Sequence, residues 1–145
     1  MSRLLSSSPR LFTQDSANRM LPLVAAISNE LIPLWENVSH TRRRLQHITD
    51  SRGAEQGDPY SDEVTAMQER LELESSKVES LVDELRELGV EFKTSDNQAH
   101  VCFPTMLEGK LVYLSWCPGD LDVCHWLEFD AKMTDRKRLA TTTLA

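Results

Sequence analysis

The sequence predicts an α+β protein in which a long, coiled-coil-like antiparallel two-helix hairpin precedes a small antiparallel β-meander. Two apolar ladders with alternating steps of three and four residues predict the helices, because such steps place apolar side chains on one helix face. A polar segment at 49–60, with two glycines and a proline, predicts the loop between them. After Gly89 apolar residues alternate with polar ones, which predicts strands.

The chain of 145 residues is expected to form one domain. Within residues 1–145 we expect the helical hairpin over about 13–89 and the β region over about 90–130. The segment 131–145 contains basic residues and a run of threonines and is expected to be a flexible tail.

The first predicted helix begins near Thr13, which can cap it, with Phe12 before the cap as a hydrophobic staple. Pro22 and Pro33 each remove a backbone donor inside this helix, so we expect a bend or a split near either one. The helix carries a polar gap at Thr41, and its ladder consists of Ala17, Met20, Val24, Ile27, Leu31, Leu34, Val38, Leu45 and Ile48.

The second predicted helix ends before Gly89, since a left-handed residue commonly terminates a helix. If Ile48 faces Val64, the numbers of facing residues add to 112 throughout the hairpin. The polar residues Thr41 and Glu74 then fall in adjacent layers, where they can fix the register of the helices. The ladder of this helix consists of Val64, Met67, Leu71, Val78, Leu81, Leu85 and Leu88.

Four strands are expected after the helices, at about 90–93, 100–103, 111–116 and 123–129. Turn-forming residues separate them at 95–97, 108–109 and 118–120. Pro104 is expected to end the second strand, because proline cannot donate to a ladder. The short turns predict a meander of neighbouring antiparallel strands.

Charge, cysteine content and the length of apolar runs indicate the cellular compartment and the kinds of partner to expect. The net charge is −7, and three cysteines are an odd number, which argues against a disulfide framework. No apolar run approaches the roughly 18 residues of a membrane span, and serines at 6–8 interrupt the stretch that a signal peptide needs. We therefore expect a cytoplasmic protein that contacts no membrane.

Three arginines at 42–44 end the first helix, whereas the second helix is acidic. They either pair with those acids and fix the antiparallel orientation, which we favour, or form a phosphate-binding patch. Because the chain is acidic and no aromatic residue lies among these arginines, we expect no nucleic acid partner.

The hairpin has more apolar side chains than its own seam can bury. A helix of about 30 residues is roughly 45 Å long, so the hairpin should protrude from the small sheet. A second copy that completes a four-helix arrangement is the simplest cover, and we expect a homodimer through the helices. The residues that require this cover are Leu21, Leu23, Ile32, Trp35, Leu73 and Val82.

Histidines and cysteines gather in the C-terminal third and give one candidate metal site. Zinc prefers four such ligands in a tetrahedron, and adjacent strands could bring these residues together. No cofactor is predicted outright, because the spacing is not that of a zinc motif, and small core cysteines are the alternative. The candidate ligands are His100, Cys102, Cys117, Cys124 and His125.

A second candidate is a contact surface for an unknown protein or a small ligand at the sheet. Carboxylates beside aromatic rings can hold a cationic or metal-bearing ligand, although charges at strand edges also serve solubility alone. No catalytic residue is identified, since the sequence has no nucleophile elbow and no glycine-rich phosphate loop. The candidate surface residues are Trp116, Asp120, Trp126, Glu128, Asp130 and Arg136.

The string Phe12-Thr13-x-x-x-Ala17-Asn18-x-x-Leu21-Pro22 resembles the opening of an uncharacterised bacterial family, domain of unknown function 2203. The resemblance resumes at Phe103-Pro104, at Gly109-x-x-Val112-Tyr113-Leu114-x-Trp116, at Gly119-Asp120, and at Trp126, Glu128, Asp130 and Arg136. It covers nearly the whole chain. It implies two long helices followed by a small β region, and it implies no activity.

The chain departs from that family at three positions. Ser16 replaces a capping glutamate, Ser115 replaces a cysteine before the strand tryptophan, and Leu127 replaces a histidine. Cys117 and His125 lie one or two residues away, so a family metal site would be lost or rebuilt here. We therefore favour a non-enzymatic binding or scaffolding module that acts as a hairpin homodimer. The alternative is a small metal-binding protein or metal-dependent enzyme.

Overall fold

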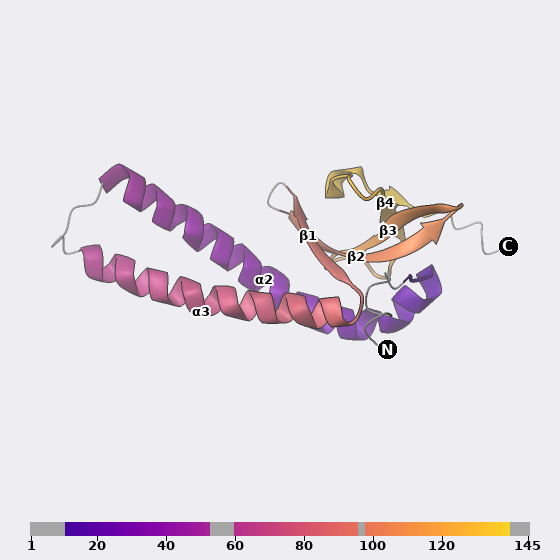
Figure 1. The fold of residues 1–145 in the computed structure, drawn as a ribbon, viewed down its shortest axis with the longest axis horizontal. Helices are drawn as coiled ribbons and strands as arrows, with labels where there is room; N and C mark the ends of the chain where they lie inside the picture. The colour runs from indigo at the N-terminus through magenta and orange to yellow at the C-terminus, as the bar shows by residue number, and fades with distance from the viewer. Residues whose placement is uncertain (1–10, 53–59, 96–97, 140–145) are drawn as a thin grey trace, which may run out of the picture.

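The computed structural model describes residues 11–52, 60–95 and 98–139, without the side chains of 51, 52, 60 and 61. The expected loop at 49–60 is wrong at its ends, because residues 49–52 and Tyr60 are helical, and its middle, 53–59, lies outside the described residues. Residues 96–97 of the expected turn at 95–97 and the tail beyond 139 also lie outside them. Two helices, α2 (Gln14–Arg52) and α3 (Tyr60–Glu87), precede a five-stranded sheet. The predicted α+β fold, a helical hairpin followed by an antiparallel meander, is confirmed (Figure 1).

Helix α2 begins with a reciprocal cap in which Ser16 takes the place of a glutamate. The Thr13 amide donates to Ser16 Oγ at 2.9 Å, and the Ser16 amide donates to Thr13 Oγ1 at 3.0 Å. Pro22 and Pro33 lie inside α2, which nevertheless continues to Arg52, so a split is wrong. The axis changes direction instead, and the N-terminal part of α2 lies at an angle to the rest (Figure 1).

Helix α3 ends at the predicted glycine. Gly89 has a φ of 86°, and the Val90 amide donates to the Leu85 carbonyl at 3.0 Å, which completes a Schellman cap. The hairpin register agrees with the expectation to within about a turn. Residue numbers add to 111 for the contact of Asn37 with Glu74 and to 107 for that of Lys77 with Glu30.

The sheet is an antiparallel meander in the order β1-β2-β3-β4-β5. Strands β1 (Glu91–Ser95), β2 (Gln98–Leu107), β3 (Lys110–Trp116) and β4 (His125–Leu127) follow the predicted order, although β4 is shorter than expected. Leu107 and Lys110 flank the Glu108-Gly109 turn, as expected.

Strand β2 continues through Pro104, so the expected end at this residue is wrong. The Pro104 carbonyl points to the outer edge of the strand, where it accepts a hydrogen bond from the Phe12 amide at 2.7 Å. The Pro104 nitrogen faces the same edge. Strand β1 pairs with β2 only as far as Glu91, which lies opposite Cys102, so no β1 residue is paired with Pro104. The proline ring therefore removes no ladder hydrogen bond.

Residues 131–139 are ordered, whereas the sequence suggests a flexible tail. A 3₁₀ turn, η1 (Met133–Asp135), leads into β5 (Lys137–Arg138), which pairs with β4. The Leu139 amide extends this pairing with a 2.8 Å bond to the Cys124 carbonyl. Two basic residues and a following leucine are too short a pattern to predict a strand, so only its partner strand specifies it.

One face of the sheet packs on the base of the hairpin and forms the core. Val24, Leu31 and Leu85 from the helices meet Val101 and Phe103 from β2, and all five are essentially inaccessible to solvent. The hairpin extends well past the sheet, as its length requires (Figure 1). Neither described helix combines the length and apolarity needed to cross a membrane.

Candidate functional site

The sheet face turned away from the helices carries a buried polar cluster. Cys102, Ser115 and His125 lie side by side across β2, β3 and β4, because the ladders pair Ser115 with both of the others. His100 Nδ1 lies 2.7 Å from Ser115 Oγ and 3.7 Å from Cys102 Sγ. Arg136, just before β5, reaches the same serine with its Nη1 atom at 3.5 Å.

Arg136 and Asp120 form a nearly buried, bidentate ion pair beside this cluster. The Arg136 guanidinium donates to both carboxylate oxygens at 2.9 and 3.1 Å, and the side chains are only 17 and 14% exposed. The Cys117 amide donates to the same carboxylate at 3.2 Å. Burial alone raises the pKa of Asp120, but these hydrogen bonds and the charge of Arg136 outweigh it, so the pKa lies below its ordinary value.

The titratable groups of the cluster are held in their neutral forms. Burial lowers the pKa of His100 to about 4, with help from the positive charges of Arg136 and Lys93. Burial also raises the pKa of each thiol, at Cys102, Cys117 and Cys124. A protonated thiol is a weak nucleophile and a weak metal ligand, so these cysteines resemble packing groups more than reactive ones.

The five predicted metal ligands do not form one site. His100 pairs with Cys102, Cys117 Sγ donates to Asp120 at 3.7 Å, and Cys124 Sγ lies 3.5 Å from His125 Nδ1. Across residues 11–52, 60–95 and 98–139, no three His, Cys, Asp or Glu side chains are placed to hold one metal ion. The common zinc site drawn from the sequence is therefore not assembled by this arrangement.

The six predicted surface residues fall into two groups. Trp116 is only 4% exposed and donates from Nε1 to the Asp120 carbonyl at 3.1 Å, so with Asp120 and Arg136 it belongs to the interior. The other three are Trp126, which is half-buried, Glu128, which pairs with Lys110 at 2.8 Å, and Asp130, which is exposed.

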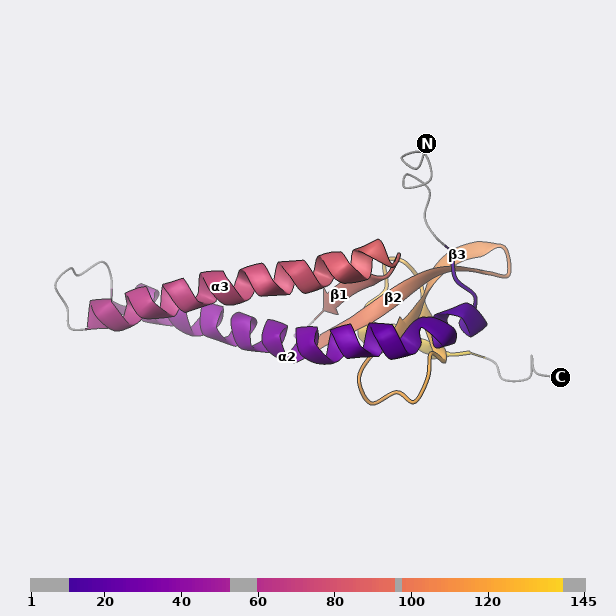
Figure 2. The same ribbon diagram turned by 90° about the horizontal axis from the view of Figure 1, so that it is seen from below.

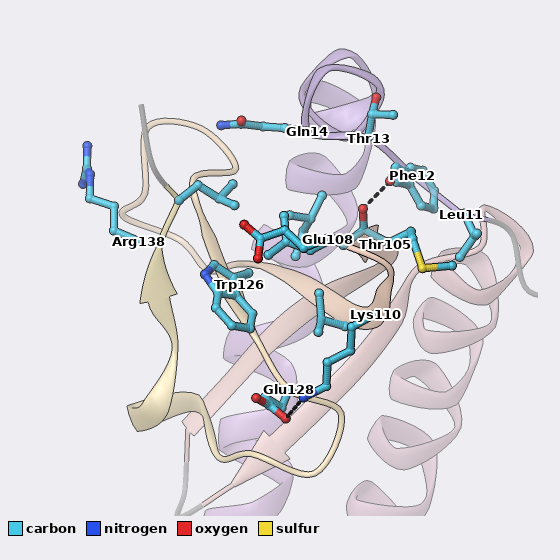
Figure 3. Close-up of a pocket in the computed structure, with 15 residues that line it drawn as sticks. Leu11, Phe12, Thr13, Gln14, Thr105, Glu108, Lys110, Trp126, Glu128 and Arg138 are labelled. Carbon is cyan, nitrogen blue, oxygen red and sulfur yellow. Dashed lines mark hydrogen bonds and ion pairs between the residues drawn. The ribbon is translucent and has the colours of Figure 1, made fainter. Parts of the chain in front are cut away.

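Trp126 and Glu128 line a groove of about 760 Å³ at the sheet end of the molecule (Figure 3), which we call the sheet-end groove. Its walls come from the segment before α2, the β2–β3 hairpin, and β4 with β5. This volume lies in the range of known ligand sites. The apolar lining consists of Leu11, Phe12, Met106, Leu107, Val112, Leu114, Trp126 and Leu139.

Charged residues of both signs surround this apolar floor. Lys110 and Glu128 neutralise each other, which leaves Glu108 and Arg138, and neither makes an ion pair with any residue that the structure describes. Figure 3 shows the Glu108 carboxylate directed toward the same space as the Trp126 ring. Glu108 has a φ of 52°, a left-handed conformation that glycine or asparagine adopts more readily.

The groove is built mostly from residues that sequence reasoning did not select. Met106 is 50% exposed at the end of β2, and Leu11 lies at the start of the described chain. Leu11 precedes a helix with an apolar face and Met106 lies near the end of an apolar strand. Nothing in the local sequence therefore distinguishes these two residues from the core residues beside them. The sequence does predict a turn at Glu108 and Gly109, but it does not show that this turn lies beside the other walls of the groove.

The structure shows a role for Asn18, one residue of the N-terminal string that carries the family resemblance. Its Oδ1 accepts from the Val123 amide at 2.7 Å, and Gln14 Nε2 donates to the Val123 carbonyl at 3.0 Å. The first turns of α2 thereby hold the β3–β4 loop in place, with Val123 fully buried. The string therefore encodes the junction between helix and sheet.

Comparison with known proteins identifies a family for this chain. No curated protein and no solved structure matches the chain significantly. The family described as uncharacterised conserved protein DUF2203 matches residues 10–139, a range that includes every residue the structure describes. The chain therefore belongs to the DUF2203 family.

Proposed function

We propose that this protein is a non-enzymatic binding module whose sheet-end groove holds an amphipathic segment of a partner protein. The observation that carries the proposal is the combination of an apolar floor with two charges of opposite sign, Glu108 and Arg138, that form no ion pair with the described part of the chain. The buried cluster around His100 supports a structural role for that face, because its groups are neutral and Ser115 is inaccessible to solvent.

The mixed charge of the rim favours a polypeptide as the occupant. A fatty acid or an organic amine offers one sign of charge and would leave either Glu108 or Arg138 opposed by a like charge or by none. A protein segment can place a basic side chain against Glu108, an acidic one against Arg138 and apolar side chains on Trp126 and Met106 between them. The two-residue hairpin turn requires the left-handed backbone at Glu108, and it holds this side chain beside the groove.

A peptide library displayed on phage tests this proposal. Selection on the intact protein should enrich sequences in which apolar residues are flanked by a basic residue on one side and an acidic residue on the other. Met106→Asp should weaken binding of the enriched peptides by at least tenfold, because it places a charge on the apolar floor. Met106 is half exposed, so this change should leave the fold intact.

Two further variants separate the groove from the rest of the surface. Glu108→Lys should reverse the charge preference of the enriched peptides at the position that is basic for the parent protein. Leu121→Asp is the matched control, because Leu121 is 98% exposed in the β3–β4 loop and does not line the groove. Enriched peptides that bind Met106→Asp and the parent equally well would refute the groove as the binding site.

We also propose that the module is a cytoplasmic homodimer that associates through the helices. The three cysteines are free thiols, which suits a reducing compartment. The seam of the outer half of the hairpin is only partly covered in one copy, since its residues are half-buried and not buried, namely Leu45, Ile48, Val64, Met67 and Leu71. Light scattering at micromolar concentration should give twice the chain mass of 16.5 kDa, and a monomer mass would remove this part of the proposal.

A further inference from the structure

The two flanks of the helical hairpin differ in burial. On the flank toward the sheet, Ser28 and Ile32 are buried, and Trp35 packs edge-on against Phe92 at 6.0 Å. On the opposite flank, Leu23 and Leu73 are 52 and 74% exposed, although both are leucines on helices. The view in Figure 2 shows the helices in front of the strands, so no described element covers this opposite flank, which we call the outer flank.

The charges on the outer flank form a self-complementary pattern. Near its middle, Lys77 Nζ pairs with Glu30 at 3.6 Å within one copy. Toward the hairpin tip lies Arg44, and toward the sheet lies Glu84, seven residues after Lys77 and thus on the same side of α3. Neither Arg44 nor Glu84 makes an ion pair within residues 11–52, 60–95 and 98–139.

We propose that the outer flank binds the same flank of a second copy in antiparallel orientation, with Arg44 against Glu84 of the partner subunit. This inference rests on the proposed homodimer and adds its geometry. In the register in which facing residue numbers add to 112, Glu84 lies level with Ser28 of α2. A two-fold axis level with Glu36 then brings Arg44 of each copy level with the partner's Glu84, so that one symmetric interface pairs both charges twice.

The same axis places the exposed side chain of Leu73 near the centre of the interface. Leu73 lies level with Ser39 and therefore within one helical turn of the axis, so the two copies of Leu73 meet and exclude water there. A parallel arrangement would instead set Arg44 beside the partner's Arg44 and Glu84 beside the partner's Glu84, which like charges oppose.

This geometry has a consequence for scaffolding. Antiparallel hairpins direct the two sheets to opposite ends, so the two sheet-end grooves are separated by at least the hairpin length, on the order of 40 Å. A dimer of this form can hold two partner segments at once and bridge them, which raises its apparent affinity for any partner that presents two copies of the segment.

Charge reversal tests the orientation in the full-length protein. Arg44→Glu and Glu84→Arg should each raise the dimer dissociation constant about tenfold at low ionic strength, because each converts two attractive pairs into two repulsive ones. The double variant that carries both changes should return the constant to within about threefold of the parent value. Sedimentation equilibrium gives all four constants.

Charge reversals away from the outer flank serve as matched controls for the effect on the dimer dissociation constant. Arg42→Glu alters an arginine whose contact is Ser75 within the same copy, and Glu72→Arg reverses an exposed acid of α3 that lies away from the outer flank. Both should change the constant less than threefold. A parent protein that is dimeric, but whose constant rises in the double variant as much as in the single ones, refutes this orientation while leaving the proposed dimer standing. A parent that is monomeric refutes both.

Cross-linking gives a second readout of direction. A mixture of the Arg44→Cys and Glu84→Cys variants should form a mixed disulfide dimer under mild oxidation, with the parent chain as the control for its own three cysteines. Arg44→Cys alone should form no such dimer beyond that control. If Arg44→Cys alone cross-links efficiently and the mixture does not, the hairpins associate in parallel and the proposal is wrong.

Discussion

Replacing Asp120 with alanine is expected to lower the free energy of unfolding by about 3 kcal/mol. The change removes the carboxylate that accepts both Arg136 bonds and the Cys117 amide bond. Arg136 would then keep its charge at a site where its side chain is only 17% exposed, with Ser115 as a weak remaining partner at 3.5 Å. Loss of one partner from a buried ion pair lowers the free energy of unfolding by about 3–5 kcal/mol. Arg136 and Asp120 keep some exposure to solvent, so we expect a loss at the lower end of this range.

Urea denaturation followed by circular dichroism measures this loss. Arg136→Ala should cost a similar amount, and the double variant should cost less than the two single changes added together, because neither charge is then left alone. Glu128→Ala is a suitable control, since its pair with Lys110 is short but lies in solvent and should contribute little. A loss below about 1 kcal/mol for Asp120→Ala would show that Arg136 finds another partner or swings into water.

The helical hairpin could be predicted because its determinants are local. The ladder of α2 from Ala17 to Val38 and that of α3 from Leu81 to Leu85 each specify a face by spacing alone. Thr13 and Gly89 mark ends that follow from side-chain and backbone chemistry within a few residues. The prolines in α2 are the exception, because tertiary packing against the sheet maintains the helix where local chemistry favours a break.

The sheet could be predicted in outline and the candidate site could not. The ion pair of Arg136 with Asp120 joins a pre-strand segment to a loop 16 residues earlier, and the groove joins Leu11 to a hairpin more than 90 residues later. Such contacts depend on how β5 and the segment before α2 dock, which no periodicity encodes. Trp116 and Trp126 show the same limit, since their similar settings in the sequence give one buried and one half-buried ring.

Lowering the pH from 7 to 4.5 is expected to reduce the free energy of unfolding by about 2–3 kcal/mol through His100 alone. This side chain is 3% exposed and has a pKa of about 4 in the folded protein, against about 6.5 in an unfolded chain. Between these values the unfolded chain binds a proton that the folded one does not. The stability that the neutral imidazole contributes is therefore fully present above pH 6.5 and is lost as the pH falls toward 4.

The groups around His100 give this prediction its sign. Arg136 and Lys93 oppose a positive imidazole, Cys102 is neutral, and Ser115 Oγ already satisfies Nδ1, so no facing group stabilises the proton. Asp120 does not contribute in this window, because its pKa lies below the ordinary value and its stabilising charge is lost only below about pH 4.

His100→Gln isolates this contribution, because glutamine can keep a hydrogen bond to Ser115 but does not titrate. Its free energy of unfolding should fall much less than that of the parent between pH 7 and 4.5, when both are measured by urea denaturation. His125→Gln should retain most of the parent slope, since His125 on β4 is only half-buried, although burial lowers its pKa as well. Equal slopes for the parent and His100→Gln would mean that protonated His100 finds water or an acid in the folded protein. The cluster around His100 would then open at acidic pH.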